Sequence, residues 1–282
     1  MPENNKPNVY VYHDFVKFLN DWLVFLRKTR SDFSLRNLAK QSTIALGYMN
    51  MILKRERSMS EKAFLKIVSN LHLAIDEEKY LNLLRIVDQT EDSNARLQAV
   101  SEMMKIKKFK FNNQKENRTY EYLTKWYFVA VYEMFNLDDF KCDAKWIRAK
   151  LRKKLALAEI EQAIDFLKVN NFVKQNPNGT WSQSNAHLDC TEGIFKVSLA
   201  EFHKQMLELA HESIYAAKAS ERFIMGQTMT ISKSDFEKIK QIIQNSVASI
   251  NEVNSGAASK TEVYHIEIAA FPLSEPNKES IK

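Results

Sequence analysis

Near its N-terminus the chain carries apolar residues at the spacing of a helix-turn-helix, and this spacing constrains the fold more than any other feature. Ala39 lies in the first of two predicted short helices, Ile44 follows in the turn, and Met49 and Ile52 lie in the second helix. A small alanine lets two helix axes cross closely, and the later apolar residues seat the second helix. The pattern predicts a helix-turn-helix over residues 34–54, with an ordinary helical hairpin as the alternative.

The second of these helices offers few side chains that can recognise a base. Asn50 can bond adenine in a bidentate way and Tyr48 is the other polar candidate, but the helix has no Arg or Lys to bind guanine. Gly47 weakens the helix, and no Ser or Asp caps it. Basic residues flank the helix and suit phosphate contacts, which position a protein without specifying sequence. These phosphate-binding candidates are Arg36, Lys40, Lys54, Arg55 and Arg57. The alternative is a solvated basic face.

Helical periodicity extends over most of the chain and predicts a mainly α fold with a smaller α+β part. Apolar residues at helical spacing predict five helices in an N-terminal helix-turn-helix domain over residues 1–90. The following segment, 91–119, is polar and repeatedly charged. We therefore expect a charged linker there, or a helix that frays into one.

Two further domains are predicted after this segment. Three helical stretches and a hairpin have the element order of a winged helix, so a winged-helix-like domain is expected over residues 120–190. Residues 191–282 contain a long helix, then strand-like alternation at 222–232 and 261–274 on either side of another helix. That order predicts a small α/β C-terminal domain.

A basic run at residues 141–154, with seven Lys or Arg among fourteen residues, lies within the predicted winged helix. The helix expected to enter a DNA groove, however, carries Glu159, Glu161 and Asp165, which a polyanion would repel. This domain is expected to act in dimerisation or signal relay, with a second DNA-binding element as the alternative. The C-terminal domain is expected to be structural or dimerising, and the alternative is an effector pocket. The candidate lining of that pocket is Arg222, Tyr264 and His265.

Composition and motif content limit the possible functions. The formal net charge of +6 is small for 282 residues, so contacts with a polyanion should come from local patches. Two distant cysteines, an N-terminus without an apolar signal segment and the absence of an eighteen-residue apolar run predict a soluble, cytoplasmic protein with no membrane partner.

The sequence also offers little that could support catalysis. It has no dinucleotide-binding glycine motif, no phosphate-binding loop and no CxxC pair. Glu208 with His211, and Glu262 with His265, have the E-x-x-H spacing of some metal sites, but the second pair lies in a predicted strand. We therefore expect no catalytic site, no cofactor and no metal.

Several stretches together resemble a known bacterial family. They are FSLRNLAK at residues 33–40, YMNMILKRERSMS at 48–60 and a leucine-rich helix with an acidic start at Asp76-Glu77-Glu78. The closing segments RFIMGQTMTIS and TEVYHIEIAAFPLS extend the similarity over most of the chain. The chain resembles the TIGR02147 family, whose C-terminal part is the DUF4423 domain. The resemblance implies a lambda-repressor-like DNA-binding region joined to a domain of unclear role, in proteins usually labelled transcriptional regulators.

These observations favour a dimeric transcriptional regulator whose helix-turn-helix docks in the major groove of double-stranded DNA, with C-terminal domains for dimerisation or signal sensing. The alternative is a protein-interaction adaptor that keeps the scaffold but has lost base-specific recognition; a metal-dependent enzyme ranks third. The exposure of Leu46 and Met51 distinguishes the first two hypotheses. Buried side chains there favour DNA, whereas a protruding apolar patch favours a protein partner.

Overall fold

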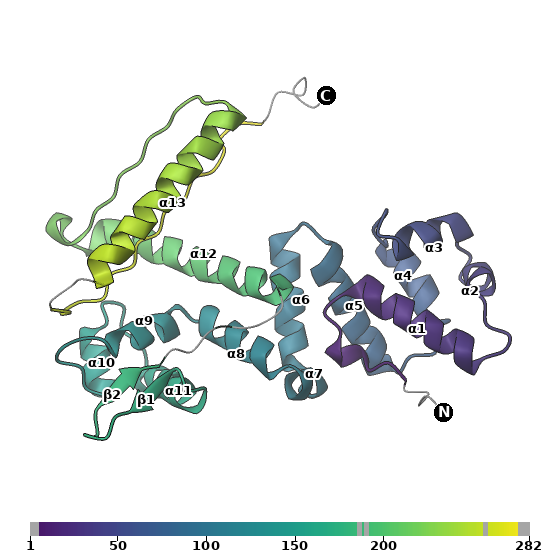
Figure 1. Cartoon of the computed structure of the whole chain (residues 1–282), viewed down its shortest axis with the longest axis horizontal. Coiled ribbons are helices and arrows are strands. Elements are labelled where there is room, and N and C mark those ends of the chain that lie inside the picture. The colour runs from purple at the N-terminus through teal and green to yellow at the C-terminus, as the bar shows by residue number, and fades with distance from the viewer. Residues whose placement is uncertain (1–5, 185–187, 189–191, 256–258, 276–282) are drawn as a thin grey trace. The chain divides into compact units, whose positions relative to one another are not determined.

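The computed structural model describes residues 6–184, 188, 192–255 and 259–275. Within these ranges the chain is mainly helical, and its strands form one two-stranded sheet (Figure 1). The chain divides into two units. The first comprises residues 1–124 and 187–201, and the second comprises 125–186 and 202–282. The expected predominance of helix is therefore confirmed.

The first unit is built around the amphipathic helix α1 (Phe15–Thr29), which begins where the Asp14 side chain accepts the backbone N–H of Lys17. The apolar face of α1 is fully buried, and the indole of Trp22 donates a hydrogen bond to the carbonyl oxygen of Leu71 at 3.1 Å. Removing the apolar side chains of this face from water stabilises the unit. The other elements up to residue 90 are η1 (Val9–Val11), α2 (Leu35–Gln41), α3 (Leu46–Leu53), α4 (Glu61–Val68) and α5 (Ile75–Gln89).

Residues 91–119 do not form a linker between domains. They form α6 (Ser93–Lys105), α7 (Lys107–Asn112) and the first part of α8 (Gln114–Leu123). Val100 and Phe109 are fully buried in the core of the first unit, so this charged segment is amphipathic. This segment is therefore helical, and its buried side chains add to the N-terminal core.

In the second unit, three helices precede a short antiparallel hairpin. Strands β1 (Val173–Gln175) and β2 (Trp181–Gln183) pair with Lys174 opposite Ser182. The predicted turn is present: Gly179 has a φ of +84°, which glycine adopts without strain. Rings from two of the helices and from the residue just before β1 pack together in the core: Phe128, Phe166 and Phe172. The three helices are α9 (Trp126–Met134), α10 (Ala144–Lys150) and α11 (Leu157–Val169).

A long helix, α12 (Glu192–Ala216), contributes to both units. Its early residues Ile194 and Val197 are buried and belong to the core of the first unit. Phe202 and Met206 are buried in the second unit. The short η2 (Ala219–Glu221) and the helix α13 (Lys233–Ser255) follow.

The two strands predicted at 222–232 and 261–274 are not formed. The described residues of both segments carry no helix or strand assignment, and Figure 1 draws both as extended chain. A strand requires a hydrogen-bonded neighbour, and none of the described segments supplies one. The alternating pattern therefore does not form the predicted α/β layer within the part of the chain that the structure describes.

Candidate nucleic-acid interface

Helices α2 and α3 meet through the tight turn that the sequence predicts. Helix α2 is capped by Ser34, whose hydroxyl accepts the Asn37 N–H at 3.1 Å. At its C-terminal end the N–H of Ile44 bonds the carbonyl oxygen of Ala39 at 2.9 Å, and Thr43 occupies the left-handed region with a φ of +53°. These bonds satisfy the last carbonyl groups of α2 and reverse the chain.

The residues predicted to seat α3 do so. Ala39, Met49 and Ile52 are buried, each 2% exposed or less, and Ile44 packs against the same core from the turn. Because these side chains face inward, the opposite side of α3 is left at the surface. The spacing therefore identified the inner face of the two helices correctly.

The outer face of α3 is small and polar. Ala45, Gly47 and Asn50 are exposed at the surface. The larger apolar side chains of Leu46 and Met51 are half-buried and so do not protrude. Ala45, the residue before α3, provides no side-chain cap for the helix, as expected from the sequence. A Cβ atom placed on Gly47 would meet no other atom within 4 Å, so the fold itself does not require glycine there.

The side chain of Tyr48 forms hydrogen bonds within the first unit. Its hydroxyl donates to the carbonyl oxygen of Ser58 at 3.1 Å and accepts the N–H of Ser60 at 3.3 Å. The guanidinium of Arg57 lies over the Tyr48 ring, 5.5 Å from its centre. Tyr48 therefore anchors the loop between α3 and α4 and holds Arg57 close to α3.

All five predicted phosphate-binding residues are exposed around α2 and α3, and Arg55 is also paired with carboxylates. The other four are Arg36, Lys40, Lys54 and Arg57. Arg55 forms an ion pair with Asp14, and its guanidinium lies 3.9 Å from an Asp88 carboxylate oxygen. Burial raises the pKa of the Asp88 carboxyl, Asp14 adds to this rise, and Arg55 opposes it. Sequence analysis missed both carboxylates, because they are distant along the chain.

A known protein family matches the part of the chain that follows α2 and α3. A family described as "Domain of unknown function (DUF4423)" matches residues 106–273, more than half of the chain. The chain belongs to the DUF4423 family. This confirms the DUF4423 part of the resemblance drawn from the sequence. No curated protein and no solved structure matches the chain. No helix in the described part of the chain is long and apolar enough to cross a membrane.

Within the DUF4423 region, the basic run at 141–154 is largely engaged by groups of its own unit. Three of its side chains form ion pairs: Lys150 with Asp139, Arg152 with Glu221, and Lys153 with Glu212. The Lys154 ammonium donates to three carbonyl oxygens around the end of α10, where the helix dipole favours a cation.

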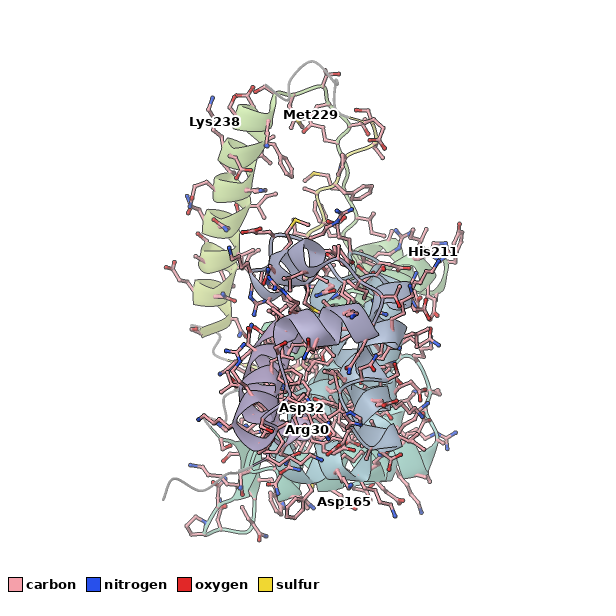
Figure 2. The ribbon with its side chains drawn as sticks, turned by 90° about the vertical axis from the view of Figure 1, so that its right-hand side faces the viewer. Arg30, Asp32, Asp165, His211, Met229 and Lys238 are labelled. Atoms are coloured by element: carbon pink, nitrogen blue, oxygen red, sulfur yellow. The ribbon has the colours of Figure 1, made fainter. Side chains whose placement is uncertain are left out.

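The next helix of the DUF4423 region, α11, presents acidic groups. Glu161 and Asp165 are exposed, and Figure 2 shows Asp165 at the molecular surface. Glu159 instead accepts the backbone N–H of Ala156 at 2.9 Å and caps the helix. This surface does not attract a polyanion.

The E-x-x-H pairs of the DUF4423 region do not assemble into a metal site. Glu208 and His211 are exposed on α12, and Figure 2 shows His211 at the surface. Among the described residues, no group of three or more His, Cys, Asp or Glu could hold a metal ion.

A contact that the sequence did not predict joins the second extended segment to α12. The carboxylate of Glu267 lies 3.0 Å from Nδ1 of His203 and 3.0 Å from Nε2 of His265. His265 also packs edge-on against Phe202. The imidazole of His265, expected to line an effector pocket, therefore attaches this segment to α12. Of the other candidate lining residues, Arg222 donates to the Ala217 carbonyl oxygen and Tyr264 is 63% exposed.

Proposed function

We propose that this DUF4423 protein is a DNA-binding transcriptional regulator related to the TIGR02147 family. Helices α2 and α3 would form a lambda-repressor-like helix-turn-helix, with α3 in the major groove of double-stranded DNA. A homodimer would place two copies of α3 about one helical turn of DNA apart. The second unit, with winged-helix element order, would act in pairing or signal relay.

The observation that carries this proposal is the composition of the outer face of α2 and α3. The large apolar side chains of α3 are buried or half-buried, so this helix does not offer the protruding patch that a protein-interaction adaptor would need. The exposed side chains on and just after it are mostly small, amide or basic, and Glu56 is the acidic residue among them. A polar, positively charged helix face is suited to DNA.

The residues have distinct roles under this proposal. Asn50 is the base-contacting residue, because its exposed amide can donate to and accept from one adenine edge. Tyr48 positions the following loop, and Arg55 contributes to the stability of the first unit through its carboxylate partners. The remaining basic side chains would bind phosphates: Arg36, Lys40, Lys54 and Arg57.

Fluorescence anisotropy of the full chain with a labelled, randomised duplex pool, across a salt series, tests this function. Binding should weaken steeply with salt, because each phosphate contact releases a counterion. Sequencing of the bound fraction should then yield a palindromic motif. The absence of binding even at low salt would overturn the proposal.

Paired charge reversals locate the interface. Lys54→Glu with Arg57→Glu should abolish binding, because both side chains are exposed beside α3. Lys79→Glu with Lys110→Glu makes the same change in net charge on α5 and α7, where both lysines are exposed. This control should retain most of the affinity; equal loss in both variants would point to non-specific attraction.

A further inference from the structure

The chain after Met206 contains many apolar side chains, but none of its described residues is buried in a hydrophobic core. Most of the exposed large apolar side chains of the described chain lie between Leu207 and Leu273. Phe223 is 85% exposed, Val253 76% and Phe271 70%. Burial of such side chains is the main driving force of folding, so this part of the chain lacks the core that its composition can build.

The backbone of the two extended segments in this region also lacks backbone partners among the described residues. Among the described residues, no backbone–backbone hydrogen bond involves residues 223–231 or 261–273. Figure 1 shows the first segment as an arch that leads into α13, and Figure 2 labels Met229 of this segment and Lys238 of α13 at the same end of this region. Unpaired extended segments with alternating apolar side chains are templates for another strand.

The number of elements points to a second copy of this chain as the partner. One chain supplies two extended segments and one amphipathic helix, which is less than the smallest stable sheet layer. Two copies supply four segments and two α13 helices, enough for a sheet covered on one face by helices. A twofold pair of identical chains is also the commonest form of protein assembly.

The charges of the region favour the same partner. Residues 241–251, three turns of the exposed helix α13, contain no charged side chain. The first extended segment, 222–232, carries only Arg222, whereas 259–275 carries Lys260 against three glutamates. Two acidic segments would repel each other, so each is better matched with the first segment of the other copy.

We propose that two copies of this chain associate through α13 and the extended segments, with residues 222–232 of one copy pairing with 261–274 of the other. The two strands predicted from the sequence then form between chains. This interface would supply the pairing that the proposed DNA-binding function requires, but its existence does not depend on DNA.

Sedimentation velocity of the full chain without DNA tests the assembly. The wild type should sediment with twice the mass of the chain. Met225→Asp with Ile266→Asp should weaken association by more than about tenfold, because both side chains would be buried between copies. Both are exposed in the single chain, so circular dichroism should be unchanged. Ile75→Asp, at an 85% exposed residue on α5, is the matched control and should remain dimeric.

Mixing two proline variants tests the crosswise pairing. Thr228→Pro with Met229→Pro removes adjacent N–H groups from the first segment, and Ile268→Pro with Ala269→Pro does so in the second. Each variant alone should be monomeric, because both of its intermolecular edges are damaged. A mixture should regain dimers, because one edge then joins two intact segments.

Three results would overturn the proposal or part of it. A wild type that remains monomeric at all concentrations contradicts the assembly, and a dimer insensitive to the Met225 and Ile266 changes places the interface elsewhere. Failure of the mixture to dimerise contradicts crosswise pairing. Because no DNA is present, these outcomes are distinct from a failure of DNA binding, and a monomeric chain that still binds DNA would separate the two proposals.

Discussion

The left-handed conformation of Thr43 is the local feature on which the turn between α2 and α3 depends. A β-branched residue with a φ of +53° is strained, because its side chain crowds the backbone. The hydrogen bond from the Ile44 N–H to the Ala39 carbonyl oxygen holds Thr43 in this conformation.

Thr43→Gly should therefore raise the free energy of unfolding of the first unit by about 1 kcal/mol. Urea denaturation followed by circular dichroism measures the change. Thr90→Gly, where φ is an ordinary −88°, is the control and should lose stability. A loss of stability at Thr43 as well would show that the threonine side chain contributes more than its strained backbone costs.

Arg55 has partners in the fold that the sequence does not reveal. It lies in a basic cluster and was predicted to bind phosphate, but in the folded unit it faces two carboxylates. Its partner Asp14 is 41 positions away in the sequence, so only the packing of α1 against α3 brings them together. By contrast, the burial of Ala39, Met49 and Ile52 follows from local spacing and was predictable.

Arg55→Gln should accordingly affect stability more than DNA affinity. It should lower the free energy of unfolding by about 1 kcal/mol, because Asp14 and Asp88 lose a common cation. Arg57→Gln should weaken DNA binding with little effect on unfolding. Denaturation and anisotropy on both variants measure the two effects, and the reverse pattern would contradict these assignments.

At the scale of elements, α3 is a short helix with a weak start. It has no side-chain cap at Ala45 and contains Gly47 in its first turn. Gly47→Ala should stabilise the first unit by about 1 kcal/mol, since the added methyl group has space and alanine favours helix.

The same substitution should weaken DNA binding if the backbone of α3 approaches the duplex closely at Gly47. Thermal denaturation and anisotropy of Gly47→Ala together measure the stability and the affinity. A stabilised variant with unchanged affinity would place the first turn of α3 away from the DNA.

The elements that the sequence predicted correctly are those defined by local signals. Helices α2 and α3 follow from apolar spacing, and the hairpin follows from the Asn178-Gly179 turn. Local signals could not predict whether strands form at 222–232 and 261–274, because a strand needs a hydrogen-bonded neighbour that alternation alone does not identify. The exposure of Asn50 followed from the spacing, but the engagement of Tyr48 depends on the loop that returns at Ser58.

At the scale of the whole molecule, pH should affect the stability of the first unit through His13. Burial lowers the pKa of this imidazole below its ordinary value of 6.5, and Glu116 opposes the shift. The unfolded chain therefore binds the proton more readily, so the stabilising contribution is complete above pH 6.5 and is lost as pH falls through the folded-state pKa.

Unfolding midpoints in urea between pH 8 and pH 5 should show this loss in the wild type. The variant His13→Gln should have a shallower dependence over the same interval, because it cannot be protonated there. Parallel slopes for the two proteins would assign the pH dependence to groups other than His13.

The exposed methionines of the first extended segment have a consequence for chemical durability. Met225 is 82% exposed and Met229 46%, so in a lone chain peroxide can reach both thioethers and convert them to sulfoxides. A sulfoxide is polar and fits poorly against apolar neighbours, so an oxidised chain would associate less readily and expose its thioethers for longer. Methionine oxidation should therefore be faster in a dilute sample than in a concentrated one, where the copies are associated. Mass spectrometry after a brief peroxide pulse measures the extent of oxidation at the two concentrations.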